Sequence, residues 1–446
     1  MAAVQEKPST TASSALSLQV RFVTKQEQYS IPDFPYSISA NVGTDELNSV
    51  INRVLIEDDV IEKQKEFDFL IGGEFLRGTL EELVLRHEAL KEKIVDDKDE
   101  DDDTEKKKIG VEEVIEVEYV ERTPAPEPEN CLMHDDWVSA VDATSNWILT
   151  GCYDATLHLW TGKGKHKQGF PAHSGPIKAV CWVSSTPEST VFASASHDQT
   201  VMIWEWDLSN NNVSCKWICK GHERSVECIK PDRQAAHLAS GSWDGQLKIW
   251  TVAADKPTED GAVGESTSSK GATKTPLMTL AGHKESVSAV QWSDEKELIS
   301  ASWDHTIKLW DVEMGGMKAE IAGNKAFFDM SWSALNNTAI TSSADRHIRL
   351  YDPRSNEGSL VKCMFTSHNG WVSSVNWSLT NENLFVSGSH DKLMKLWDRR
   401  SPRAPLYNMT GHTENILCTS WANPDYMMSG GSDNTLRIFK AKTDLK

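Results

Sequence analysis

The chain has 446 residues, of which 39% are apolar, enough for two or more packed domains. Its net charge of −20 is uneven, because residues 1–130 carry 15 basic and 31 acidic side chains and the remainder carries 31 and 35. This acidity argues against a nucleic-acid clamp in the front part, since phosphate would be repelled, and it favours a basic or metal-bearing partner. No run of 18 apolar residues, of the kind that spans a membrane, occurs in the sequence.

The two ends and the cysteines carry little specific signal. Residues 1–16 are rich in serine and threonine and lack the apolar segment of a secretory signal, so we expect a disordered terminus. The eight cysteines are scattered and none forms a CxxC pair. This favours buried, reduced thiols of an intracellular protein over a zinc site.

Residues 17–121 contain alternating strand and helix patterns. Thr44 is expected to cap a helix with Leu47, Ile51 and Leu55 on one stripe, and Thr79 to open a second, short helix. Strands are predicted where apolar and polar residues alternate, at residues 18–24, 36–42, 67–71 (interrupted by Asp68) and 115–119. The order strand, strand, helix, strand, short helix, strand predicts a small α+β ubiquitin-like domain.

Two segments of unusual composition follow the short helix. Residues 91–108 form a predicted acidic loop, because eight of the ten residues at 96–105 are acids and cannot pack. It is either a spacer or a binding tail. Residues 122–130, rich in proline, are predicted to be an extended linker.

Seven copies of one motif occupy residues 131–440. Each copy has an aspartate followed six positions later by an aromatic residue, and successive aspartates lie 44, 46, 60, 41, 46 and 42 residues apart. Short alternating strands at a period of 40–45 are typical of four-stranded WD40 blades, so we predict a seven-bladed β-propeller, a mainly β fold. The long spacing is attributed to a disordered insertion at residues 252–276, and residues 441–446 are a tail. The motif pairs are Asp154 with Trp160, Asp198 with Trp204, Asp244 with Trp250, Asp304 with Trp310, Asp345 with Tyr351, Asp391 with Trp397 and Asp433 with Phe439.

A histidine precedes the motif aspartate in six of the copies. In WD-repeat proteins, which these copies resemble, that histidine joins the turn aspartate to a strand serine or threonine, which in turn binds the tryptophan. A catalytic triad is the competing interpretation, but a nucleophilic site occurs once and this set recurs. Copy five lacks the histidine and ends in Tyr351, and copy seven ends in Phe439, so each is expected to lose one polar link. The histidines are His134, His173, His222, His283, His368 and His412.

Features outside the repeat motif leave alternatives open. The chain has no phosphate-loop, dinucleotide-binding or zinc-protease motif. Basic clusters at residues 346–349 and 392–403 either contact RNA phosphates or are solvated blade edges. Four tryptophans lie in turns or at blade starts, outside the motif position at the end of each copy. They either form a docking face for a protein or pack between blades. They are Trp137, Trp243, Trp303 and Trp371.

The order of these parts, together with several local stretches, resembles one family. FDFLIGGEFLRGTL, EVEYVERTPAPEPE, SASWDHTIKLWDVE and ADRHIRLYDPRSNEGSL match the Ytm-type WD-repeat ribosome-biogenesis family of the PeBoW complex, with its Notchless-like front domain. The resemblance covers residues 18–440 and implies a non-enzymatic scaffold in the nucleolus and nucleoplasm, needed for maturation of large-subunit ribosomal RNA. It implies that the propeller binds the propeller of a Bop-type partner, which holds Pescadillo, on precursors of the 60S subunit.

The resemblance also implies a role for one glutamate before the last strand of the front domain. In the family, the AAA ATPase midasin grasps this domain, and the glutamate completes midasin's divalent-metal site before the protein is pulled from the particle. Counting back from Val117–Tyr119 places it at Glu112, with Glu113 as the alternative. No cofactor of the chain's own is implied. A general WD-repeat adaptor in ubiquitin-linked or signalling complexes is the rival interpretation, and direct RNA contact is a second.

Overall fold

The fold consists of two compact units, Met1–Thr123 and Pro124–Lys446. A computed structural model describes residues 17–72, 74–82, 85, 114–252, 272–353 and 361–441. Strands dominate both units, and within these described ranges no helix is long and apolar enough to cross a bilayer.

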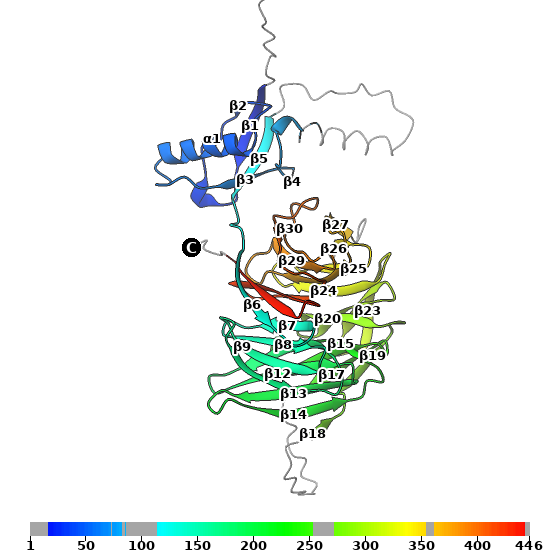
Figure 1. The fold of residues 1–446 in the computed structure, drawn as a ribbon. Helices are drawn as coiled ribbons and strands as arrows, with labels where there is room; N and C mark the ends of the chain where they lie inside the picture. Colours follow the sequence, from blue (N-terminus) through cyan, green and yellow to red (C-terminus); the bar gives the residue numbers. More distant parts are fainter. Residues whose placement is uncertain are drawn as a thin grey trace, which may run out of the picture. The chain divides into compact units, whose positions relative to one another are not determined.

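Among its described residues, the front unit is a five-stranded mixed sheet with the α-helix α1 and a short helical stretch at residues 80–82 (Figure 1). Its elements are β1 (Ser17–Val23), the 3-10 turn η1 (Glu27–Tyr29), β2 (Tyr36–Ser39), α1 (Thr44–Glu57), β3 (Phe67–Ile71), β4 (Glu74–Phe75) and β5 (Val114–Glu121). The strand order is β2–β1–β5–β3–β4, with β1 and β5 parallel and the other pairs antiparallel. This is the ubiquitin-like arrangement predicted from the sequence.

The core of the front unit lies between α1 and the sheet. Leu47, Ile51 and Leu55 recur every fourth residue and are fully buried in a cluster with Phe69 and Tyr119. The helix begins at Thr44, but its N-cap is Gly43, whose backbone N–H donates to Glu46 Oε2 at 3.0 Å. The expectation that Thr44 caps the helix was therefore wrong by one residue. The N-cap is Gly43, and the Glu46 side chain accepts the hydrogen bond of its backbone N–H.

Two further expectations concern the edges of this unit. Asp68 does not interrupt β3, since its carboxylate accepts a hydrogen bond from Arg122 Nε at 2.9 Å inside a fully buried strand. Residues 80–82 are helical, and Glu82 N–H donates to Thr79 Oγ1 at 3.3 Å. The acidic loop at 91–108 lies outside the described residues.

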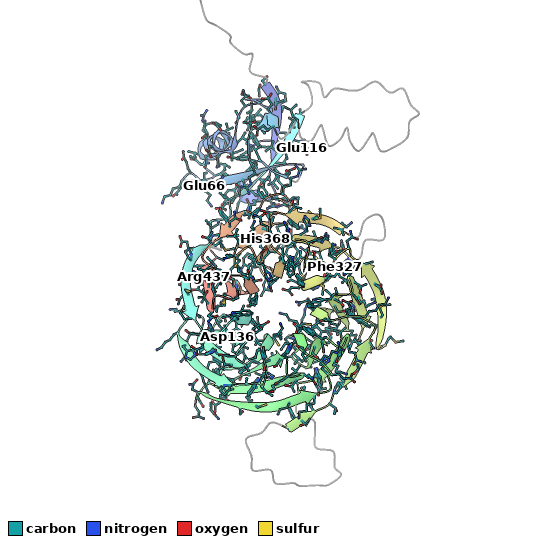
Figure 2. All side chains as sticks on the ribbon, turned by 45° about the vertical axis from the view of Figure 1, so that its right-hand side comes forward. Glu66, Glu116, Asp136, Phe327, His368 and Arg437 are labelled. Carbon is teal, nitrogen blue, oxygen red and sulfur yellow. The ribbon has the colours of Figure 1, made fainter. Side chains whose placement is uncertain are left out.

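The second unit is a propeller of seven sheets arranged in a ring (Figure 2). Blade one comprises β7 (Val138–Ala143), β8 (Trp147–Cys152), β9 (Thr156–Thr161) and β10 (His166–Pro171); blade two β11 (Ile177–Ser185), β12 (Ser189–Ser196), β13 (Thr200–Asp207) and β14 (Asn212–Lys220), with β18 (Ala272–Lys274) added; blade three β15 (Val226–Pro231), β16 (His237–Ser242), β17 (Gln246–Thr251) and β19 (Met278–Ala281). Blade four comprises β20 (Val287–Asp294), β21 (Glu297–Ser302), β22 (Thr306–Asp311) and β23 (Gly316–Ala322); blade five β24 (Phe327–Ser333), β25 (Thr338–Ser343), β26 (His347–Tyr351) and β27 (Val361–Thr366). Blade six comprises β28 (Val372–Trp377), β29 (Leu384–Ser389), β30 (Met394–Asp398) and β31 (Tyr407–Met409); blade seven β32 (Ile416–Asn423), β33 (Tyr426–Gly431), β34 (Thr435–Lys440) and β6 (Glu127–Met133).

Apolar side chains from neighbouring blades interlock between the sheets. Trp310 of blade four is 2% exposed and packs in one cluster with Leu247 and Ile249 of blade three. Trp250 of blade three likewise packs against blade two. Because a single sheet leaves such faces exposed to water, each blade depends on its neighbours.

The ring closes through a strand from the other end of the propeller. β6 pairs antiparallel with β34, with Leu132 opposite Leu436. Residues 127–130, which the sequence assigned to the linker, therefore belong to this closing strand. The prolines at residues 122–130 were interpreted as a linker, but the outer strand of a sheet also tolerates proline, so the propeller begins earlier than predicted.

The end of the insertion in blade three forms a strand. Ala272–Lys274 form β18, which pairs parallel with β14 of blade two. Lys274 is buried, its ammonium lies 4.4 Å from the centre of the Trp217 ring, and it donates to Thr251 O at 2.8 Å. This end of the segment 252–276 is thus a strand rather than a disordered loop; residues 253–271 lie outside the described part.

Candidate protein-interaction face

Four blades contain a complete polar latch of histidine, aspartate, serine and tryptophan. In blade four, His283 Nδ1 lies 2.9 Å from Asp304 Oδ2, His283 Nε2 lies 2.7 Å from Ser300 Oγ, and Trp310 Nε1 donates to the same Oγ at 2.8 Å. We define the side of the ring that carries these histidines and turn aspartates as the latch face. The corresponding sets are His173 with Asp198, Ser194 and Trp204 in blade two, His222 with Asp244, Ser240 and Trp250 in blade three, and His368 with Asp391, Ser387 and Trp397 in blade six.

Two of the latch tryptophans also stack on a phenylalanine of their own blade. The rings of Trp204 and Phe192 are nearly parallel with centres 6.4 Å apart, and those of Trp397 and Phe385 are nearly parallel at 6.1 Å. Trp204 is 7% exposed and Trp397 is fully buried. Both indoles therefore belong to the blade interior and contribute nothing to a docking surface.

In blade four, electrostatics set the protonation of the latch. The pKa of Asp304 falls to about 2: burial opposes ionisation, but hydrogen bonds from Thr306, Lys284 N–H and His283 outweigh it. Burial lowers the pKa of His283, against the opposing effect of Asp304. The neutral imidazole of His283 is held between the Asp304 carboxylate and the Ser300 hydroxyl, and that hydroxyl also accepts the Trp310 N–H. This arrangement stabilises the blade and has a structural role.

The remaining three blades carry incomplete latches. In blade one, His134 Nε2 contacts Thr150 Oγ1 at 2.9 Å, and Trp160 donates to that oxygen at 3.1 Å, but Asp154 bonds Thr156 instead of His134. The sequence did not reveal this loss, because every motif residue is present. In blade seven, His412 contacts Asp433 and Ser429, and Phe439 has no indole to add.

Blade five replaces the missing histidine with an arginine. Arg349 binds both carboxylate oxygens of Asp345, and Ser343 Oγ donates to Asp345 Oδ1. An ion pair from Arg349 of β26 therefore holds the turn aspartate that a histidine holds elsewhere. Tyr351 fills the position of the latch tryptophan, but its buried hydroxyl has no hydrogen-bond partner among the described residues, so the indole's hydrogen bond is lost in this blade.

Acid is expected to weaken the propeller through its buried histidines. Burial, then the neighbouring His158, lowers the pKa of His134 from 6.5 to about 4. The unfolded chain takes up a proton near pH 6.5 whereas the folded chain does not, so this contribution to stability is complete above pH 6.5 and is lost on acidification. Urea unfolding at pH 7.5 and 5.0 should show that His134→Gln removes about 2 kcal/mol of the wild-type pH dependence. An unchanged pH dependence in the variant would contradict the assignment.

Six aromatic side chains form a continuous belt on the latch face. Ring centres are 5.9 Å apart for Trp243 and Trp303, 6.3 Å for Trp303 and Phe328, and 5.8 Å for Phe328 and Trp371. His197 and His390 extend the belt at its two ends, at 5.4 and 5.8 Å from the nearest indole. The aromatic belt, His197–Trp243–Trp303–Phe328–Trp371–His390, thus runs from blade two to blade six.

The belt is solvent-exposed although its members contact one another. Trp243, Trp303 and Trp371 are 37%, 38% and 51% exposed. Trp137, 44% exposed, contacts Tyr153 at 5.2 Å on blade one. Half-exposed tryptophans held by neighbouring rings lose little conformational entropy on binding, so this surface has the character of a protein-docking face.

Sequence reasoning found the four tryptophans but missed the other belt residues. Phe328 is the second residue of an inner strand, and His197 and His390 each stand immediately before a turn aspartate. The last two positions correspond to Trp243 and Trp303 in blades three and four. An aromatic residue or histidine immediately before the turn aspartate recurs in these four copies, and aligning the copies would have revealed His197 and His390.

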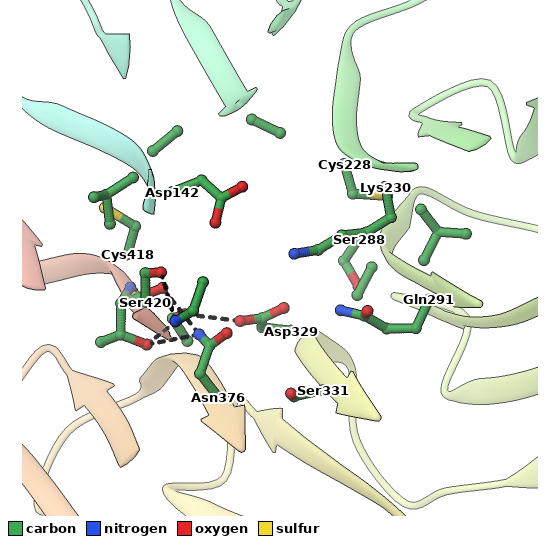
Figure 3. A pocket seen from close by; sticks show the side chains of 18 of the residues that line it. Asp142, Cys228, Lys230, Ser288, Gln291, Asp329, Ser331, Asn376, Cys418 and Ser420 are labelled. Atoms are coloured by element: carbon green, nitrogen blue, oxygen red, sulfur yellow. Dashed lines mark hydrogen bonds between the residues drawn. The ribbon is translucent and has the colours of Figure 1, made fainter. Parts of the chain in front are cut away.

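A channel of about 720 Å³ runs along the axis of the ring and is lined by its inner strands. Polar side chains there join one blade to the next: Asp142 Oδ2 accepts from Trp182 N–H at 2.9 Å, and Asn376 Nδ2 donates to Thr419 O at 2.9 Å (Figure 3). Asp329 Oδ2 accepts from Ser374 Oγ at 2.7 Å, and burial raises the pKa of Asp142 and of Asp329. These carboxylates therefore act as braces between blades.

The other candidate residues lie apart from the belt. The basic cluster at 392–403 is largely paired, since Arg400 binds Asp398 at 2.7 Å and Lys395 donates to Ser367 O at 2.8 Å. Glu112 and Glu113 lie outside the described residues; β5 starts directly after them at Val114, which is 46% exposed. Within the described ranges, no three histidine, cysteine, aspartate or glutamate residues are grouped to hold a metal ion.

Comparison with known families agrees with the two units. Residues 18–84 match the NLE (NUC135) domain. The WD domain, G-beta repeat, matches residues 127–161, 164–205, 213–251, 274–311, 358–398 and 403–440. The gap in these matches contains β24 to β26 of blade five, where Arg349 replaces the latch histidine.

Whole-chain relatives identify the family. The ribosome biogenesis protein WDR12 homologue of Culex quinquefasciatus is 51% identical over 431 residues, covering 95% of this chain and 96% of its own. The homologue of Aedes aegypti is 50% identical over 438 residues, with 97% of each chain covered. That of Drosophila mojavensis is 50% identical over 429 residues, with 95% of each covered. With its NLE domain, its seven-sheet propeller and identity over nearly its full length, this chain belongs to the WDR12 family of ribosome biogenesis proteins.

Proposed function

We propose that this protein is a non-enzymatic scaffold for assembly of the large ribosomal subunit, acting in the nucleolus and nucleoplasm on 60S precursors. The proposal rests on the relatives, whose names say ribosome biogenesis, and on the rigid propeller with its exposed aromatic belt. Loss of the protein should block maturation of large-subunit ribosomal RNAs. In a sucrose gradient of nuclear extract, the protein should co-sediment with 60S precursors; sedimentation only at the top would contradict the proposal.

The aromatic belt is the proposed docking face for the propeller of a Bop-type partner, through which Pescadillo is held. The observation that carries this proposal is the exposure of Trp243, Trp303 and Trp371 in one continuous chain of ring contacts. Tryptophan dominates the energetic centres of protein interfaces. Direct RNA binding is disfavoured at the 392–403 cluster, because Lys395 and Arg400 already bind Ser367 and Asp398 of the same chain.

The front unit is proposed to be the part that midasin binds. Glu112 precedes β5 and would offer a carboxylate oxygen to a divalent cation held by midasin, since hard cations prefer oxygen ligands. The chain supplies one ligand and midasin supplies the metal with the rest of its coordination shell. Removal of the protein from the particle would follow.

Replacing Glu112 by alanine is expected to abolish binding of the front unit to the metal-site domain of midasin. The loss of a metal ligand should reduce affinity at least 100-fold, and chelation of divalent cations by EDTA should do the same to the wild type. Biolayer interferometry with the full chain measures both effects.

Two variants act as controls for this experiment. Glu113→Ala tests the alternative register, and Glu116→Ala removes an exposed β5 carboxylate that lies 3.6 Å from Arg21. Both should retain midasin binding, and Glu112→Ala should retain binding to the Bop-type propeller. Wild-type affinity for midasin in Glu112→Ala would refute the assignment.

A further inference from the structure

The end of the channel opposite the latch face carries two exposed leucines. Leu335 and Leu379 are 52% and 60% exposed and lie in the β24–β25 and β28–β29 turns, which line the channel mouth in blades five and six. Asn336 Nδ2 donates to Glu382 O at 2.8 Å and so ties the two turns together. We define the leucine mouth as Trp332, Leu335, Trp377 and Leu379.

Two buried indole N–H groups in blades five and six have no hydrogen-bond partner among the described residues. In blades two and four, the tryptophan near the end of the inner strand donates to the preceding blade: Trp182 Nε1 to Asp142 O at 3.3 Å and Trp292 Nε1 to Lys230 O at 3.1 Å. In blades five and six, Trp332 Nε1 and Trp377 Nε1 are buried and have no hydrogen-bond partner. Each such donor costs about 1–3 kcal/mol. Trp377 is only 4% exposed and lines the channel, so its N–H is a buried donor that lacks a partner at the edge of the mouth.

The turns around this end of the channel are acidic. They carry five exposed carboxylates against two exposed basic side chains; one of the two, Lys296, is paired with Glu313, and one of the five carboxylates, Glu382, lies 3.7 Å from Arg399. A basic ligand is favoured here and nucleic acid is repelled. The carboxylates are Glu188, Asp294, Glu295, Glu382 and Asp425, and the basic residues are Arg233 and Lys296.

We infer that the leucine mouth is a second docking site, which binds an extended, basic, leucine-bearing segment of another protein. A leucine of that segment packs between Leu335 and Leu379. A backbone carbonyl accepts the N–H of Trp377, and flanking lysines or arginines lie over the acidic turns. Because the mouth and the aromatic belt are at opposite ends of the channel, two proteins can occupy the propeller together. This site does not depend on the proposed function.

Fluorescence anisotropy with a labelled Arg-Leu-Arg-Leu-Lys-Arg peptide and the full chain tests the inference. The wild type should bind, with affinity falling as salt increases, and a Glu-Leu-Glu-Leu-Asp-Glu peptide should not. Leu335→Ser combined with Leu379→Ser, which removes the apolar contacts without adding charge, should weaken binding at least 30-fold. Trp377→Phe, which keeps the bulk of the ring but removes the N–H, should weaken it about 3- to 10-fold.

Matched variants elsewhere on the surface separate this site from general stickiness. Met314→Ser alters a side chain that is 83% exposed outside the mouth, and Trp371→Ala alters the belt; both should bind the basic peptide like the wild type. Equal binding of the acidic peptide, wild-type affinity in the double leucine variant, or loss of binding in Trp371→Ala would each overturn the inference.

Discussion

Replacing Trp303 and Trp371 together by alanine is expected to weaken binding of the proposed partner, a Bop-type propeller, about 1,000-fold. Each indole is more than a third exposed and contacts Phe328, so each truncation removes an interface anchor and loosens the belt. A tryptophan of this kind contributes about 2 kcal/mol or more at an interface, and the pair about 4 kcal/mol. Isothermal titration calorimetry with the purified partner propeller measures the change.

Two comparisons keep this result interpretable. The thermal midpoint of the double variant should stay within a few degrees of the wild type, because the changed side chains project from turns and a blade start. Leu335→Ser with Leu379→Ser, at the other end of the channel, should leave the partner's affinity unchanged. If the belt variant bound at wild-type strength, the partner would dock elsewhere.

Asp304→Ala is expected to be among the most destabilising single changes in the propeller. The carboxylate holds His283 Nδ1, Lys284 N–H and Thr306 at once, and its removal leaves buried donors without partners. The expected loss is about 3 kcal/mol in the free energy of unfolding. Urea denaturation at pH 7.5, followed by tryptophan fluorescence, gives this value.

Blade one supplies the matched control. Asp154 stands at the same position in the repeat, but it bonds Thr156 and not His134. Asp154→Ala should therefore cost about 1 kcal/mol, the value of an exposed turn bond. Equal losses at Asp154 and Asp304 would show that the turn, and not the histidine link, is what the aspartate stabilises.

The repeat pattern predicted the propeller because it is local and recurs. An aspartate six positions before an aromatic residue specifies a turn and a strand whatever the neighbouring blades do, so the seven sheets followed from spacing alone. The front sheet was predicted for a similar reason, since Val20, Phe22 and Tyr119 alternate with polar residues. Asp68 broke that pattern because its partner, Arg122, is distant in sequence.

What the sequence did not predict depends on contacts between distant segments. β6 pairs with a strand some three hundred residues later, and β18 crosses to the preceding blade, so neither has a local signature. His134 Nδ1 is unpaired among the described residues although every motif residue of its copy is present, so the motif does not predict this contact. The sequence pointed to the tryptophans of the docking face. That Phe328 connects Trp303 with Trp371 could be seen only in the folded structure.

The closing strand has a mechanical consequence. The front unit is covalently continuous, through residues 122–126, with β6, and β6 is held in blade seven by its pairing with β34. Tension applied to the front unit is therefore borne first by that single seam, before any other blade is loaded. A protein that pulled on the front unit would apply force directly to the β6–β34 pairing that closes the ring. The force that separates β6 from β34 is therefore the largest force that the closed propeller withstands.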